Sequence, residues 1–208
     1  MSRGLGDVYK RQVFSYKTKT DKYIVIGSSA TLSQEYRILN ADNPDGKFKI
    51  FQERVNGLEY SISHFKDKWY ITTNKDGATN FKLMSCPENK TNSKNWKEYV
   101  PHRDDVLLEG VEVFNDFLVL TERENGLRRV DIRPWSGKGR HYINFEEEAY
   151  SLYSSANPEM NTSKFRYSYS SMTTPNSVVE YDMISKDMKV LKETCLLYTS
   201  DAADDVYC

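Results

Sequence analysis

Four short segments of the chain share one pattern, in which a charged residue and an aromatic residue precede alternating apolar positions. They are residues 22–26, 68–72, 116–120 and 164–168. Alternation with a period of two is typical of short β-strands that bury one face. The aromatic residues of these segments, Tyr23, Trp69, Phe117 and Phe165, follow one another at spacings of 46, 48 and 48 residues. This nearly constant spacing predicts one structural unit of about 47 residues, repeated four times.

Each repeat contains three further segments with strand character around the common one. The first strands are expected at 13–16, 59–65, 112–114 and 150–153, the third at 35–39, 81–84, 128–132 and 177–181, and the fourth at 48–51, 96–100, 141–145 and 188–191. Turn-forming pairs such as Asp76-Gly77 and Asn125-Gly126 separate the second and third strands. We therefore expect four antiparallel strands per repeat, joined in chain order.

Four-stranded units at this period are typical of β-propeller blades. The alternative all-β interpretation is a pair of β-sandwich domains, which also have turn signals at short intervals. A sandwich has no reason to repeat at one period across four units. The sequence therefore predicts an all-β fold, a partial β-propeller of about four consecutive four-stranded antiparallel blades.

The two ends of the chain differ from the repeats. Residues 7–12 read as the translation of a transposase-type sequencing adaptor, and residues 195–200 as the translation of its opposite strand. We expect residues 1–12 and 195–208 to be adaptor-like additions that are not native. On this interpretation residues 13–194 are the propeller blades, and they form an internal piece of a longer gene.

Without those ends, 182 residues remain, with 26 basic and 26 acidic side chains and the single cysteine Cys86. Equal numbers of basic and acidic side chains produce no long-range electrostatic field that would attract nucleic acid. The longest apolar runs have four residues, against the roughly 20 that a membrane helix needs. We therefore expect neither a nucleic-acid nor a membrane partner, and the lone cysteine favours a reducing, cytoplasmic location.

The sequence offers little catalytic chemistry. The Gly-x-Ser-x-Gly motif of α/β-hydrolases is absent, and we interpret Gly27-Ser28-Ser29 as a small-residue strand end. His64, His102 and His141 have unrelated positions within their repeats, and we expect each at the surface or in a loop. The sequence therefore predicts no catalytic, cofactor-binding or metal-binding residue, and no cofactor.

Three other features have structural interpretations. Cys86 ends a third strand beside Pro87, and we expect it to be a buried or half-buried structural thiol. The acidic run 146–148 is expected in a solvated loop between blades. Asn89 and Asn161 match the glycosylation sequon, a pattern that is common by chance.

The fourth repeat contains a longer and more specific string. Residues 166–177 read Arg-Tyr-Ser-Tyr-Ser-Ser-Met-Thr-Thr-Pro-Asn-Ser, followed by Glu-Tyr-Asp-Met at 180–183 and Val-Leu-Lys at 190–192. This string closely resembles the last propeller blade of the prolyl oligopeptidase family of serine peptidases. Residues 59–61, 80–81, 107–110 and 122–127 are also similar to matching stretches of that family. The resemblance covers essentially all of residues 13–194.

The resemblance implies a cytosolic two-domain peptidase, in which a seven-bladed propeller covers an α/β-hydrolase domain and admits short peptides. It points to the branch of the family that cleaves after Arg or Lys through a Ser-His-Asp triad. The chain matches the later blades only, so no triad residue can be placed on it. We expect the parent to be a serine peptidase, its own catalytic domain and short peptides to be the partners, and this fragment to be inactive.

A second hypothesis remains open, in which the chain belongs to a free-standing propeller that acts as a scaffold for protein interaction. The two hypotheses differ in the sequence that follows. A peptidase encodes Gly-x-Ser-x-Gly after an α/β pattern begins, whereas a scaffold ends or continues with more blades.

Overall fold

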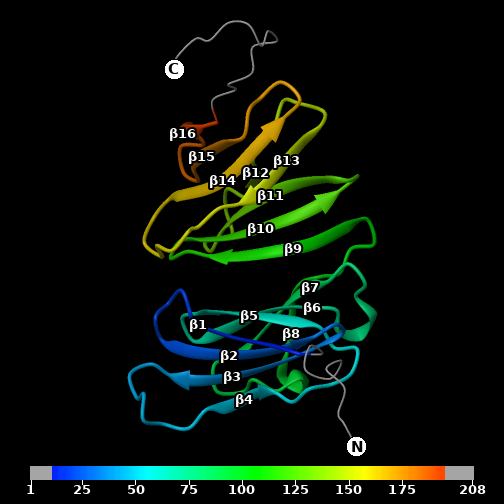
Figure 1. The fold of residues 1–208 in the computed structure, drawn as a ribbon, viewed down its shortest axis with the longest axis vertical. Coiled ribbons are helices and arrows are strands. Elements are labelled where there is room, and N and C mark those ends of the chain that lie inside the picture. The colour runs from blue at the N-terminus through cyan, green and yellow to red at the C-terminus, as the bar shows by residue number, and fades with distance from the viewer. Residues whose placement is uncertain (1–10, 195–208) are drawn as a thin grey trace, which may run out of the picture.

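The computed structural model describes residues 11–194, which form four antiparallel sheets of four strands each (Figure 1). The first sheet contains β1 (Gln12–Lys17), β2 (Tyr23–Ala30), β3 (Ser33–Asn40) and β4 (Lys49–Gln52). The second contains β5 (Tyr60–Phe65), β6 (Lys68–Thr73), β7 (Lys82–Pro87) and β8 (Lys97–Val100). The third contains β9 (Val106–Val113), β10 (Phe117–Glu124), β11 (Leu127–Pro134) and β12 (His141–Tyr142). The fourth contains β13 (Tyr150–Ser154), β14 (Lys164–Ser171), β15 (Ser177–Asp182) and β16 (Met188–Glu193).

Within residues 11–194, the remaining regular elements are two 3-10 turns, η2 (Lys75–Gly77) and η3 (Ser93–Asn95). Among residues 11–194, no helix is long and apolar enough to cross a bilayer. Most of the two segments expected to be adaptor-like, residues 1–10 and 195–208, lies outside the described residues. Gln12, the last residue of the first of them, opens β1 and pairs with Ser29.

Strands follow one another in chain order within every sheet, so each repeat is a simple meander. The turn between β10 and β11 shows how the sequence produces it, because Asn125 and Gly126 both have positive φ, at 51° and 83°. Positive φ at both central residues is the backbone of a hairpin turn whose twist matches the strands. The predicted all-β fold of four antiparallel blades is confirmed. The sandwich alternative is wrong, because an apolar core lies between each of the three consecutive pairs of sheets, whereas two sandwich domains would have one core each.

The third repeat departs most from its predicted strands. Its first strand, β9, begins at Val106 rather than at 112, and it pairs with β10 across a bulge between Thr121 and Glu122. A bulge interrupts the regular alternation from which the prediction was made. Its fourth strand has only two residues, although the backbone N–H of Ile143 also bonds to Val130 O and the Ile143 side chain packs into the core.

Three apolar layers lie between consecutive sheets, and the third and fourth sheets lie above the first and second in Figure 1. Val25 and Trp69, both fully buried, lie in the layer between the first and second sheets. Leu83 and Leu118 lie in the next layer, and Phe165 in the third. Burying both faces of the inner sheets is the main stabilisation available to such short strands.

The outer faces of the first and fourth sheets differ in character. Because Val25 faces the second sheet, its neighbours Ile24 and Ile26 point to the other side, where Ile50 is 44% exposed. The outer face of the fourth sheet instead presents two ion pairs, Lys164 with Asp182 and Arg166 with Glu180. The first outer face therefore combines apolar side chains with the ion pair of Arg37 and Glu35, whereas the second is charged.

Candidate functional site

The first strands of three sheets meet around one cavity of about 570 Å³. Its walls are the hairpin that follows β1, the middle of β5, the end of β9, and Pro158 of the link between β13 and β14. Loops and first strands from separate repeats therefore enclose a space that no single repeat forms. In a propeller, first strands lie nearest to the central axis, so this cavity, lined by three first strands, lies on the inner side of the blades.

Charged side chains line the cavity in pairs. Lys17 and Asp21, both in the first hairpin, form an exposed ion pair at 3.0 Å. Lys19, from the same hairpin, reaches Glu112 of β9, with Nζ 3.5 Å from Oε2. This second pair joins the first sheet to the third and passes by the second sheet altogether.

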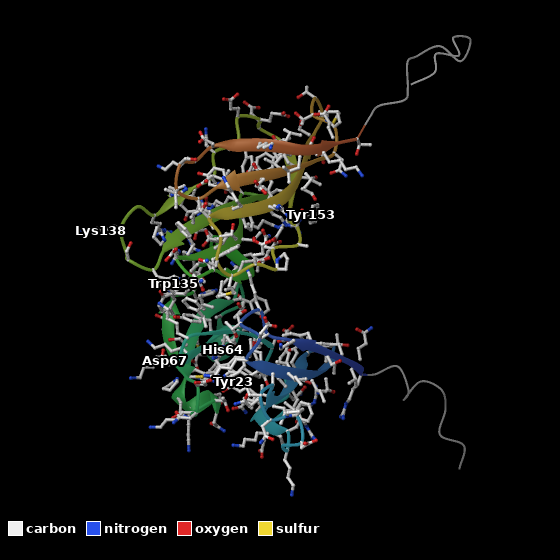
Figure 2. All side chains as sticks on the ribbon, turned by 90° about the vertical axis from the view of Figure 1, so that its left-hand side faces the viewer. Tyr23, His64, Asp67, Trp135, Lys138 and Tyr153 are labelled. Atoms are coloured by element: carbon white, nitrogen blue, oxygen red, sulfur yellow. The ribbon has the colours of Figure 1, made fainter. Side chains whose placement is uncertain are left out.

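A second polar cluster lies at the junction of the first and second sheets. Figure 2 shows Tyr23 and His64 side by side there, with ring centroids 5.0 Å apart. His64 Nδ1 lies 2.7 Å from Thr20 Oγ1, and His64 Nε2 lies 3.4 Å from Glu88 Oε1. Glu88 also accepts a hydrogen bond from the Tyr23 hydroxyl and pairs with Lys22 at 2.5 Å. Two adjacent repeats are thus joined by polar contacts as well as by apolar packing.

The expectation that His64 is a surface or loop residue is wrong. It lies in β5, is 3% exposed and packs against Trp69, with ring centroids 4.9 Å apart. Burial lowers the pKa of His64 against the opposing attraction of Glu88. The alternation of β5 places it on the same face as Ile62, and this was the signal for burial in the sequence.

Two fully buried carboxylates, Glu122 and Asp131, lie between the second and third sheets. The chain surrounds them with guanidinium groups, those of Arg103, Arg129, Arg133 and Arg140. Glu122 accepts further from the Tyr142 hydroxyl, and Asp131 accepts two bonds from Arg140. Because the chain itself supplies these partners, the network is a structural tie within the third repeat and the link that precedes it.

Ser28, the serine of the Gly27-Ser28-Ser29 segment, is held by Arg54. The guanidinium donates to Ser28 O at 2.6 Å and to Ser28 Oγ at 2.9 Å. The segment lies within β2, where the ring of Phe14 packs so closely over Gly27 that a Cβ atom there would lie 2.3 Å from a ring carbon. Gly27 is therefore needed for the close packing of the Phe14 ring on β2.

The other two histidines are partly exposed. His102 Nε2 accepts a hydrogen bond from the backbone N–H of Asn80, and His141 Nε2 lies 2.9 Å from the Tyr181 hydroxyl. His141 is in β12, whereas His102 is in a loop as expected. Cys86 is buried, as predicted, and burial raises the pKa of its thiol to about 12. Such a thiol carries almost no thiolate at neutral pH.

The acidic run 146–148 lies in the link between β12 and β13, as expected, and Glu147 accepts a hydrogen bond from Thr174. Asn161 accepts a weak bond from Asn115, and Asn89 lines a separate cavity of about 550 Å³. Within residues 11–194, no three His, Cys, Asp or Glu side chains lie close enough together to bind a metal ion.

The sequence alone indicates no special role for Lys19, Glu112 or Glu88, which form contacts between repeats in the structure. The available signal was a carboxylate on an inner strand: Glu112 lies in the same short apolar segment as Val113 and Phe114. The partner of such a charge comes from another repeat, so its identity depends on how the sheets stack.

Comparison with known families gives one match over residues 8–194, to the family described as "Prolyl oligopeptidase, N-terminal beta-propeller domain". The chain is 41% identical over 177 residues to "Dipeptidyl aminopeptidase BI" of Pseudoxanthomonas mexicana, covering 85% of this chain and 24% of that protein. It is 27% identical over 180 residues to "Protease 2" of Moraxella lacunata, covering 86% and 25%. The chain thus spans about a quarter of the length of the curated relatives it matches.

Solved structures of oligopeptidase B have the same fold. The enzyme from Leishmania major superposes with a TM-score of 0.79 at 25% identity, and the closed, antipain-bound enzyme from Trypanosoma brucei with 0.80 at 26%. Each superposition covers 88% of this chain and 27% of that chain. Together with the four stacked meanders, these matches establish that the chain belongs to the N-terminal β-propeller domain family of the prolyl oligopeptidases.

Proposed function

We propose that the longer protein carrying this chain is a serine peptidase that hydrolyses short peptides after Arg or Lys, and that these blades are part of the cover over its catalytic domain. The observation that carries the proposal is the family match over residues 8–194, together with the likeness to oligopeptidase B at TM-scores of 0.79 and 0.80. In this role the blades contribute steric exclusion, because a peptide must be small or extended to pass them.

The chain itself contributes no catalytic group to this proposal. Ser28 is bonded to Arg54, the Cys86 thiol is buried, and His64 contacts a threonine and a glutamate within the core. The acyl-transfer chemistry, with its triad and oxyanion hole, belongs to an α/β-hydrolase domain that we propose as the direct partner of the blades. We also propose a cytoplasmic location for the parent and short peptides as its substrates.

A second candidate activity follows from the relative at 41% identity, whose name is that of a dipeptidyl aminopeptidase. An enzyme of that kind removes dipeptides from free N-termini, whereas an oligopeptidase cleaves within a blocked peptide. The non-catalytic scaffold is a third candidate, and it requires that no hydrolase motif follows the propeller.

The coding sequence downstream of residue 194 and the activity of the full-length product separate these candidates. We expect a Gly-x-Ser-x-Gly motif, and cleavage of an N-acetylated pentapeptide with a central Arg but not of its citrulline counterpart. Cleavage that requires a free N-terminus and releases dipeptides would instead favour the second candidate. A downstream sequence of further blades without the motif would overturn the peptidase proposal.

A further inference from the structure

The ammonium group of Lys19 lies in a small site on the third sheet that Glu112 and Phe114 form, here called the cradle. Its Nζ lies 3.5 Å from Glu112 Oε2 and 3.5 Å from the centroid of the Phe114 ring. A carboxylate beside an aromatic face is a favourable environment for a cation, because the carboxylate carries a negative charge and the face of the neutral ring has a negative electrostatic potential. Lys19 is thus bound by the third sheet in the way that a cationic ligand would be.

The cradle is held in place by groups other than Lys19. Glu112 Oε1 accepts a hydrogen bond from Ser154 Oγ of the fourth sheet at 3.0 Å. Phe114 is fully buried within the core between the third and fourth sheets, and its carbonyl accepts from Trp135 Nε1 at 2.9 Å. The carboxylate and the ring therefore keep their positions when the lysine leaves.

Lys19 itself is weakly held. Its Nζ is buried yet makes no well-aligned hydrogen bond to any residue in the described part of the chain. Burial lowers the pKa of this amine, and the attraction of Glu112 only partly offsets that effect. The lysine lies in a short hairpin where Asp21 has a positive φ of 59°, next to the cavity of about 570 Å³. The cavity has room for the withdrawn lysine and for an incoming side chain.

We propose that Glu112 and Phe114 form a binding subsite for the side-chain cation of an Arg or Lys residue in a peptide, and that Lys19 occupies this subsite until the peptide displaces it. The choice of a basic peptide as ligand rests on the proposed function, in which the parent handles such peptides. The subsite selects basic peptides at the inner surface of the blades, away from the chemical step.

Peptide binding to the whole chain tests the proposal. The probe is acetyl-Gly-Arg-Gly-amide, compared with the same peptide containing citrulline, which has a similar shape and no charge. Binding is followed by nuclear magnetic resonance through the backbone amides of Glu112 and Phe114. We expect Lys19→Ala to tighten binding of the Arg peptide by about tenfold, the scale of one cation–aromatic contact, and to leave the citrulline peptide unchanged.

Matched variants separate displacement from a general loss of positive charge. Lys17→Ala removes a lysine from the same hairpin and the same cavity wall, and we expect it to change affinity by less than about twofold. Lys19→Arg again places a side-chain cation in the subsite, and we expect it to abolish the gain in affinity for the Arg peptide. Glu112→Gln in the Lys19→Ala background is expected to reduce the affinity for the Arg peptide to that for the citrulline peptide.

If Lys19→Ala does not fold, the unaltered chain still decides the question, because the Arg peptide must shift the side-chain Cε resonance of Lys19 as it displaces the ammonium. Equal binding of both peptides to Lys19→Ala, or an unmoved Lys19 resonance at saturating peptide, would overturn the subsite. Neither readout involves hydrolysis. A negative binding result therefore does not contradict the proposed cleavage after Arg or Lys. Equally, if the parent protein does not cleave after Arg or Lys, a positive binding result still supports the subsite.

Discussion

His64 Nδ1 and Thr20 Oγ1 lie 2.7 Å apart and join the second sheet to the hairpin of the first. The contact is possible because residue 64 faces the first sheet from β5 and because Thr20 lies in the turn before β2. The imidazole is buried, so the neutral ring is the favoured form in the folded chain. Protonation of this ring therefore opposes the packing of the first sheet on the second.

The first prediction concerns pH. The folded-state pKa of His64 lies below its ordinary value, so the unfolded chain binds more protons and the free energy of unfolding falls as the pH drops below about 6.5. Glu88, Lys22 and Tyr23 are the ionisable groups around the ring. Burial tends to raise the pKa of Glu88, but bonds from Lys22 and Tyr23 lower it overall, so acidification through its range destabilises the fold further.

Urea denaturation at pH 7.5, 6.5, 5.5 and 4.5 measures this effect. We expect His64→Gln to remove most of the fall in the free energy of unfolding between pH 6.5 and 5.5, because glutamine does not titrate. The fall in the free energy of unfolding near pH 4.5 should remain. A His64→Gln chain with the same pH profile as the unaltered chain would show that the titration of His64 does not control this step.

The second prediction concerns the buried carboxylates. Glu122→Gln removes the charge that Arg103 and Arg129 share, and it leaves those guanidinium groups poorly compensated beside the core. We expect a loss of about 3 kcal/mol in the free energy of unfolding. Glu124→Gln, at a partly exposed partner of Arg129, should cost less than about 1 kcal/mol. Equal losses for the two variants in urea denaturation would contradict the assignment of Glu122 as the centre of the tie.

The third prediction uses two strand glycines. A methyl group at Gly27 would lie 2.3 Å from the Phe14 ring, so Gly27→Ala must displace that ring and loosen β1. At Gly110 the nearest atom would be 3.5 Å away, an ordinary contact. We expect faster amide exchange in β1 for Gly27→Ala, with a cost of about 1–3 kcal/mol, and unchanged exchange for Gly110→Ala. Unchanged exchange in β1 of Gly27→Ala would show that the Phe14 ring moves without consequence.

The fourth prediction concerns the hairpin between β15 and β16. Asp182 accepts bonds from the backbone N–H groups of Ile184 and Ser185 and from Lys164, and these contacts lower its pKa to about 2. Asp182→Ala removes these contacts, together with one from the Ser163 hydroxyl, and should cost about 1–2 kcal/mol. Asp182→Asn keeps the oxygen that accepts from the turn, so it should cost less than half as much. A cost for the asparagine variant equal to that of alanine would show that the Lys164 pair dominates.

The repeat could be predicted because strand alternation and turn residues are local signals. Tyr23, Trp69, Phe117 and Phe165 all lie in the first two positions of the second strand of their sheets, as their spacing indicated. The one-residue offset makes Tyr23 and Phe117 face the following sheet, and Trp69 and Phe165 the preceding one. The extent of β9 could not be predicted, because its bulged pairing with β10 breaks the alternation. The family string at 166–177 gave no site either, because it occupies β14, the whole of the following turn and the first residue of β15, and its strand residues serve pairing and packing.

Contacts between repeats could not be predicted from the pattern of the sequence. Nothing local to Lys19 indicates that its partner is Glu112, which lies in the third sheet, two repeats away. The burial of His64 follows from alternation in β5, but its partners Thr20 and Glu88 belong to other segments. The site therefore depends on the stacking of sheets, which only the folded chain defines.

The most direct test of the central claim is the specificity of the full-length protein toward blocked short peptides. We expect kcat/KM for an acetylated pentapeptide with a central Arg to exceed that for its citrulline counterpart by at least about a hundredfold, since the selective site must pair a buried charge. We also expect a folded protein that displays the same sequence to resist cleavage. Equal rates for the two peptides, or no hydrolysis of either, would contradict the account.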